Sequence, residues 1–176
     1  MRTWKVASLV IATALVSMTV VGAMARPNAL PPDTTGTGIT LVKIATGEVP
    51  VGTSAQTWTN VYGARAVIKV PKGTKAIIDA RFASWSDCYA TSGTPTGYCM
   101  ARILIGKAQG LPFTGDMWAE VLNGVGDHRG VRAMEQSRGP LGPGVYTVQV
   151  QHETGDPDIY FSLHGFHLTV ERITAQ

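Results

Sequence analysis

The stretch Leu141-Gly142-Pro143-Gly144-Val145-Tyr146-Thr147-Val148-Gln149-Val150-Gln151 decides the fold. From Tyr146 onward apolar and polar residues alternate, which is the period of a strand with one buried face and one wet face. Pro143 and Gly144 supply the preceding turn, because proline fixes φ and glycine accepts positive φ. The spacing Leu-x-Pro-Gly-x-Tyr predicts a tyrosine corner, in which the Tyr146 hydroxyl bonds to upstream backbone. This device is typical of Greek-key β-sandwiches.

The rest of the chain breaks into short apolar runs separated by turn residues about every 8–12 residues, as in all-β proteins. No run of about 10–12 residues keeps a 3.6-residue period, so no substantial helix is predicted. The expected fold is all-β: a two-sheet antiparallel β-sandwich with jelly-roll or other Greek-key topology. Strands are predicted at 39–45, 57–62, 64–70, 76–82, 100–105, 117–122, 131–137, 145–151, 159–163 and 166–173.

Three further local features are expected. The strands 64–70 and 76–82, separated by a Pro/Gly turn, are predicted to pair as a hairpin. Residues 84–98 and the glycine-rich segment 124–130 are predicted to be loops. Arg102, in an otherwise apolar strand, is expected to pair with an acid such as Asp79 or Glu171.

The first 25 residues have the pattern of a cleavable secretion signal. Arg2 and Lys5 precede an apolar run, and Ala23-Met24-Ala25 matches the A-x-A cleavage site. The small-residue site and the short apolar run disfavour the alternative of an uncleaved membrane anchor. We therefore expect a signal peptide at 1–25, a flexible Pro/Thr/Gly leader at 26–38 and a single β-sandwich domain at 39–176. The expected location is secreted or extracytoplasmic.

The charge and hydropathy of the mature chain narrow its partners. The formal net charge is +3 and falls to +1 when Arg2 and Lys5 leave with the signal. A nearly neutral surface gives no reason to expect nucleic acid as a partner. No later apolar segment reaches the roughly 18 residues that suggest a membrane span, so no membrane insertion is expected after signal cleavage.

The two cysteines, Cys88 and Cys99, are predicted to form a disulfide, because an even number in an exported chain usually pairs. Closing this loop stabilises the fold by about 2.5–3 kcal/mol on the chain-entropy model. Two cysteines cannot by themselves complete a four-ligand zinc site. No metal site and no cofactor are predicted.

The segment closed by the disulfide carries the candidate ligand-binding residues Trp85, Tyr89 and Tyr98. Aromatic side chains on a stapled loop offer flat, rigid contact area for an extracellular carbohydrate or protein. The alternative, that Trp85 and Tyr98 plug the end of the sandwich, stays open.

Histidines and acids suggest weaker sites. His164 and His167 stand three apart, which on a regular strand directs them to opposite faces. His152 and the acids of 153–158 offer ligands to calcium but lack the EF-hand spacing, so a solvated turn and a calcium site both stay open. No G-x-S-x-G, H-E-x-x-H or phosphate-binding glycine loop occurs, and no catalytic residue is assigned, although a triad assembled in space remains an alternative.

Several segments resemble small secreted bacterial β-sandwich proteins of uncharacterised function, over roughly residues 60–173. They are Val-Pro-Lys-Gly-Thr-Lys at 70–75, Asp-Ala-Arg-Phe at 79–82, Cys-Met-Ala-Arg-Ile-Leu at 99–104, Ala-Met-Glu at 133–135, Gly-Pro-Leu-Gly-Pro-Gly-Val-Tyr at 139–146 and His-Leu-Thr-Val-Glu-Arg at 167–172. The resemblance implies the fold and assigns no catalytic or binding residue.

The expected function is a secreted non-catalytic β-sandwich module with a binding or structural role outside the cytoplasm. Two alternatives remain: an extracellular hydrolase acting on a polymer, and a self-associating structural subunit.

Overall fold

The structure, a computed structural model, describes residues 36–112 and 117–176. The predicted signal peptide and residues 26–35 of the predicted leader lie outside this range. The described residues form ten strands and no helix, and hence no helix that is long and apolar enough to cross a membrane. The first strand begins at Gly36, three residues before the predicted strand start at Ile39.

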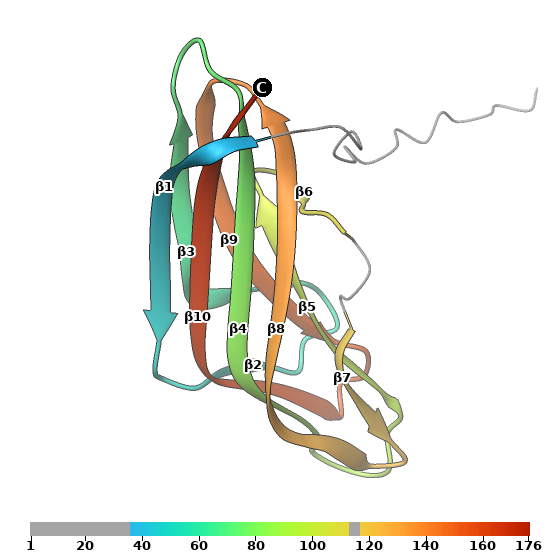
Figure 1. The fold of residues 1–176 in the computed structure, drawn as a ribbon. Coiled ribbons are helices and arrows are strands. Elements are labelled where there is room, and N and C mark those ends of the chain that lie inside the picture. Colours follow the sequence, from blue (N-terminus) through green and yellow to red (C-terminus); the bar gives the residue numbers. More distant parts are fainter. Residues whose placement is uncertain (1–35, 113–116) are drawn as a thin grey trace, which may run out of the picture.

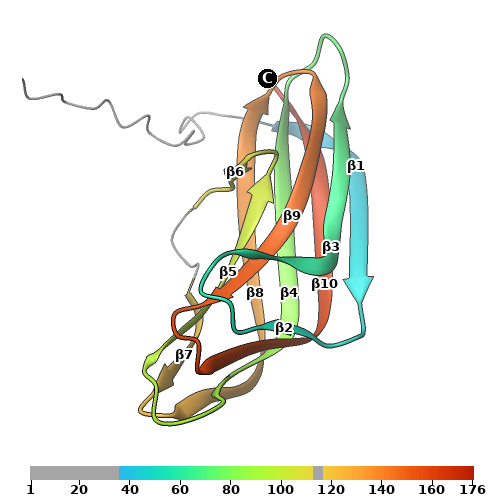
Figure 2. The same cartoon turned by 180° about the vertical axis from the view of Figure 1, so that it is seen from behind.

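The strands make two antiparallel sheets that pack face to face (Figures 1 and 2). Sheet A contains, in spatial order, β1 (Gly36–Gly47), β10 (Ile159–Ala175), β4 (Ala76–Ala90) and β8 (Val125–Leu141), with the short β2 (Val51–Thr53) on β10. Sheet B contains β3 (Thr59–Val70), β9 (Gly144–Thr154), β5 (Gly97–Ile105) and β7 (Met117–Leu122), with the short β6 (Ala108–Gln109) on β5.

The pairing of the eight longer strands is nested. β1 pairs with β10, β3 with β9, β4 with β8 and β5 with β7. This is the pattern of one long antiparallel hairpin rolled up into two sheets, which is a jelly roll. The start of β8 also pairs with β7 and so joins the two sheets. The predicted all-β sandwich is confirmed, and its topology is the jelly roll.

The stretch 141–151 takes the predicted form. Val148 and Val150 are fully buried between the sheets. The hydroxyl of Tyr146 donates to the Gly142 carbonyl at 2.9 Å, as a tyrosine corner requires. Behind this strand, a row of ring contacts crosses the core through Phe166, Phe82, Trp118, Phe161 and His152.

Two predicted strand breaks are bulges within longer strands. Residues 59–62 of the predicted segment 57–62 and the whole of 64–70 belong to β3. The register of β3 shifts between Asn60 and Arg65 around Gly63, at φ +80°. The Gln149 side-chain amide donates to the carbonyls of Val61 and Ala64 in this bulge. Segments 159–163 and 166–173 likewise belong to β10, with a register shift between them. A bulge adds a residue that interrupts the alternation without ending the strand.

The predicted hairpin of 64–70 with 76–82 is wrong. β3 pairs with β9 in sheet B, whereas β4 pairs with β10 and β8 in sheet A. The segment 71–75 therefore crosses between the sheets. Both strands alternate in the same way because both turn one face toward the same core, and alternation alone does not say from which side.

The two predicted loops are also largely strand. β4 continues to Ala90 and β5 begins at Gly97, while 125–130 is the first part of β8. Ser84 and Ser86 occupy inward positions on β4, and both are buried. The Ser84 hydroxyl contacts the Gly165 carbonyl, and the Ser86 hydroxyl contacts the Trp118 indole N–H. Because these inward positions are polar, the sequence lacks the apolar alternation that would have predicted a strand here.

Candidate binding surface

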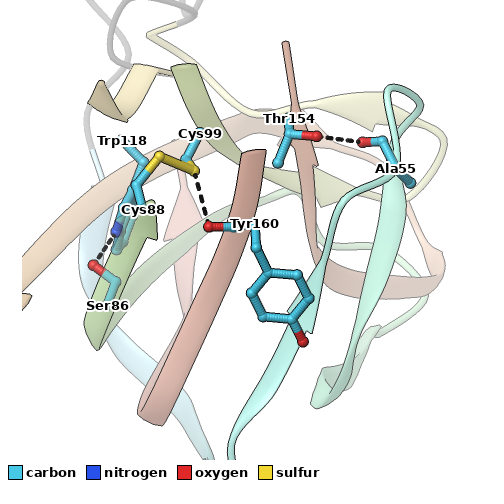
Figure 3. Close-up of a disulfide and its surroundings, with 7 residues drawn as sticks. All are labelled: Ala55, Ser86, Cys88, Cys99, Trp118, Thr154 and Tyr160. Atoms are coloured by element: carbon cyan, nitrogen blue, oxygen red, sulfur yellow. Dashed lines mark hydrogen bonds between the residues drawn. A yellow bond between two sulfur atoms is a disulfide. The ribbon is translucent and has the colours of Figure 1, made fainter. Parts of the chain in front are cut away.

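A disulfide between Cys88 and Cys99 ties β4 of sheet A to β5 of sheet B (Figure 3). Both residues are fully buried and their Cα atoms lie 6.1 Å apart. Beside them, the indole N–H of Trp118 donates to the Ser86 hydroxyl at 2.7 Å. The predicted disulfide is confirmed. It is a covalent link across the core and not a staple on a surface loop.

The disulfide fixes where the three predicted aromatic residues point. Because Cys88 and Cys99 face the core, their neighbours Tyr89 and Tyr98 project outward from sheet A and sheet B, respectively. Trp85 shares the outward side of β4 with Tyr89, and the exposed fractions of Trp85, Tyr89 and Tyr98 are 51%, 40% and 42%. The structure thus places Trp85 and Tyr89 on one face and Tyr98 on the other sheet. The tryptophan that fills the core here is Trp118, at 5% exposure.

Strand β10 extends the surface around Trp85 and Tyr89. Tyr160 lies opposite Tyr89 in register, with ring centroids 5.6 Å apart. The His164 ring lies 6.3 Å from the ring of Trp85. We call Trp85, Tyr89, Tyr160 and His164 the aromatic strip. Its residues belong to the C-terminal part of β4 and the N-terminal part of β10. These two parts of the strands bend together at the lower end of the sandwich (Figure 1). The sequence pattern did not reveal that β10 lies beside Trp85 and Tyr89.

A β-bulge places both neighbouring histidines on the outer face of sheet A. Leu163 and Phe166 are partners of Ser86 and Ser84, so two residues of β10 stand opposite Trp85 alone. His167 then faces outward like His164. The sequence-based prediction of opposite faces is wrong, because it assumed a regular strand. The available signal was Gly165, since a glycine inside a strand often marks a bulge.

The bulge is held from beneath and bordered by a depression. The Ser84 hydroxyl donates to the Gly165 carbonyl at 2.7 Å. A shallow depression of about 190 Å³ lies beside it, lined by Trp85, Val131 and His167 among others. Val131 is 80% exposed. Apolar and imidazole groups therefore continue the aromatic strip toward β8.

One member of the strip, His164, forms a polar pair with Ser162. The Ser162 hydroxyl and Nε2 of His164 are 3.2 Å apart, and Ser162 is 6% exposed. Asp87 is the register partner of Ser162 on β4. A serine beside an imidazole is the arrangement that nucleophilic hydrolases use, provided that an acid orients the imidazole.

His152, Asp156 and Asp158, which the sequence suggested as calcium ligands, are buried or make hydrogen bonds within the chain. His152 is buried on the inner face of β9, and burial lowers its pKa from 6.5 to about 4. Asp156 accepts the backbone N–H of Asp158, whose own carboxylate accepts the Ser92 hydroxyl. Among the described residues, no three His, Cys, Asp or Glu side chains gather as metal ligands. The aspartates serve the turn between β9 and β10.

The outer face of sheet B carries a polar row. The Arg102 guanidinium lies 4.1 Å from the centre of the Trp58 ring and donates twice to the Gln151 side-chain oxygen. The Gln151 amide in turn donates to Asn60. The expected pairing of Arg102 with Asp79 is wrong, because Asp79 lies in sheet A, where it contacts Arg81 and Ser137.

No model of a known protein family and no curated protein matches this chain.

Proposed function

We propose that the protein is a secreted, non-catalytic β-sandwich module that binds an extended carbohydrate chain along the aromatic strip of sheet A. The observation that carries this proposal is that Trp85 and Tyr89 are half-exposed on the same side of one strand. Secretion is supported by the signal-like sequence at 1–25 and by a disulfide of the kind that oxidising compartments form.

The geometry of the strip favours a chain of sugars. Trp85 and Tyr89 are four positions apart on β4, which is about 14 Å at about 3.4 Å per strand residue. Aromatic faces stack on the apolar C–H faces of sugar rings, and polar groups beside them bind hydroxyls. Asp87 lies between the two aromatic residues on β4, and His164 lies beside Trp85. Alternating flat and polar positions suit a linear polymer.

Features of the sheet edges argue against self-association through them. Lys43, on edge strand β1, is the register partner of the buried Val170 and so points toward the inner side of the sheet. A charge at an inward position on an edge strand disfavours pairing with another strand. At the same edge of the sandwich, the Arg172 side chain of β10 donates to the Lys69 carbonyl of β3, the edge strand of sheet B.

The test is retardation of the mature protein in gels that contain soluble polysaccharides. Trp85→Ala and Tyr89→Ala should each weaken binding about tenfold, because an aromatic stacking contact contributes roughly 0.5–1.5 kcal/mol beyond its buried area. Tyr62→Ala is the matched control, since Tyr62 is 85% exposed and lies outside the strip. Absence of retardation by every polymer, or equal losses in the control, would overturn the proposal.

A hydrolase is the second candidate function, favoured by the contact between Ser162 and His164. Ser162 would attack the ester carbonyl of an acylated sugar, and His164 would accept the serine proton and pass it to the departing sugar oxygen. Water would then hydrolyse the acyl–serine ester and release the acid. Ser162→Ala should then abolish hydrolysis of acylated sugars while leaving polysaccharide retardation unchanged. An unchanged rate in Ser162→Ala would exclude this candidate. Size-exclusion chromatography of the mature chain distinguishes these two candidate functions from that of a self-associating structural subunit.

A further inference from the structure

A second hollow lies at the sandwich edge, where β1 ends and β3 carries its bulge. It has a volume of about 250 Å³ and is lined mainly by apolar groups of Gly47, Val49, Val51, Tyr62 and Phe166. It is more enclosed than the depression beside Trp85. None of the four residues of the aromatic strip lines it.

The floor of this hollow is built from both sheets. Gly47 of β1 is the register partner of Phe166 of β10. A Cβ added at Gly47 would collide with the Phe166 ring, and one at Gly63 of β3 would lie 3.3 Å from it. Two residues without side chains thus admit the Phe166 ring, which is itself fixed by contact with Phe82. The pocket is a consequence of rigid core packing.

The rim combines exposed apolar groups with one charge. Val49 is 75% exposed and Tyr62 is 85% exposed, which is unusual for two large apolar residues beside the same hollow. Of the described residues that line the hollow, Glu48 alone is charged. A tyrosine ring and a carboxylate at one apolar opening are complementary to a cation on an apolar body.

We propose that this pocket binds an apolar group that carries a positive charge, such as an aryl- or alkylamine. The volume fits this class, because an apolar cavity of about 150 Å³ holds benzene and a larger one holds a ring with a short tail. The ring lies against Phe166 and Val51. The ammonium group lies near Glu48 and the Tyr62 ring. This site is independent of the proposed carbohydrate strip.

The test uses three probes of similar size: phenethylamine, neutral 2-phenylethanol and anionic phenylacetate. Each is titrated into the isotope-labelled mature protein, and the backbone amide signals of Gly47, Val51 and Gly63 are followed by NMR. Phenethylamine should shift these three amides and bind about two- to fivefold more tightly than 2-phenylethanol. Phenylacetate should bind most weakly.

Two exposed substitutions sharpen the test without threatening the fold. Glu48→Gln should remove the preference for the amine over the alcohol, and Tyr62→Ala should weaken the amine about two- to fivefold. Trp85→Ala is the control and should change neither titration. Absence of shifts at the three pocket amides would overturn the site. Equal affinity for all three probes in the native chain would overturn its charge preference.

Discussion

The outer faces of the two sheets both carry a tryptophan and several polar side chains, but they use them differently. On sheet B, Arg102 covers the Trp58 ring, and Gln151 links Arg102 to Asn60. On sheet A, Trp85 and Tyr89 keep about half of their surface exposed. Polar groups that bind one another stabilise the sheet that bears them, whereas an exposed aromatic surface has contact area to offer a partner. Changes in sheet B should therefore alter stability, and changes in the strip should alter binding.

Acid should produce the largest effect, through His152 on the inner side of sheet B. Burial lowers its pKa from 6.5 to about 4, so the unfolded chain takes up the proton first as the pH falls. The His152 contribution to the free energy of unfolding is complete above pH 6.5 and falls by about 3 kcal/mol between pH 6.5 and pH 4. Denaturant titrations across this range measure it.

The matched variant for this test is His152→Met, which removes the titration and keeps an apolar contact with Phe161. Its stability should depend less on pH than that of the native chain. Identical pH profiles for the two proteins would contradict the role of His152. Carbohydrate retardation by the folded native protein should persist wherever the fold does.

Removal of the disulfide comes next, because it joins the two sheets. The variant Cys88→Ser with Cys99→Ser should lose about 2.5–3 kcal/mol of unfolding free energy. The ends of β4 and β5 that carry Cys88 and Cys99 should also exchange their amide protons faster than the opposite ends do. A uniform increase in exchange would mean that the disulfide acts on the whole fold and not on the end that bears the strip.

Tyr146→Phe should cost about 0.5–1.5 kcal/mol, because it deletes the hydrogen bond to Gly142 and leaves no cavity. Thermal or denaturant unfolding measures the loss. Val145→Ala is a neighbouring control, since Val145 is 69% exposed on the same strand. Equal stability of Tyr146→Phe and the native chain would show that the corner hydroxyl does not help to hold β9.

The smallest expected changes in stability come from one substitution on the outer face of each sheet. Arg102→Met should lower the unfolding free energy by about 0.5–1 kcal/mol, through loss of the contact with Trp58, and leave polysaccharide binding intact. Trp85→Ala should change stability by less than about 0.5 kcal/mol while weakening binding. The reverse pattern, with binding lost in Arg102→Met, would move the contact surface to sheet B.

The sequence predicted the strands best where one face is apolar and regular. Segment 145–151 shows its alternation plainly, and Val148 and Val150 lie in the core as expected. In β8 the predicted strand covers only 131–137, because the glycines of 124–130 favoured a loop. Within the predicted part, Gln136 occupies an inward position. Its side chain accepts the backbone N–H of Ile103 in sheet B and donates to the Pro112 carbonyl. From the sequence alone, a polar residue such as Gln136 is predicted to face solvent, although here it closes the side of the sandwich.

The sequence analysis selected Trp85 and Tyr89 but placed them on a loop. Only because β4 extends to Ala90 does the period of two put both side chains on one face. Tyr160 and His164 lie about 70 residues further along the chain and reach them only through the pairing of β10 with β4. The bulge at Gly165 then brings His167 to the same face.

By itself, the sequence determined an all-β chain with a tyrosine corner and a cysteine pair, because alternation, turn residues and cysteine number are local properties. Only the tertiary structure decided that 64–70 and 76–82 lie in opposite sheets and that β10 completes the aromatic strip. The hollow over Phe166 was decided in the same way. The physical reason is that strand partners and bulge positions depend on hydrogen bonds between segments far apart in sequence, which a side-chain pattern does not record.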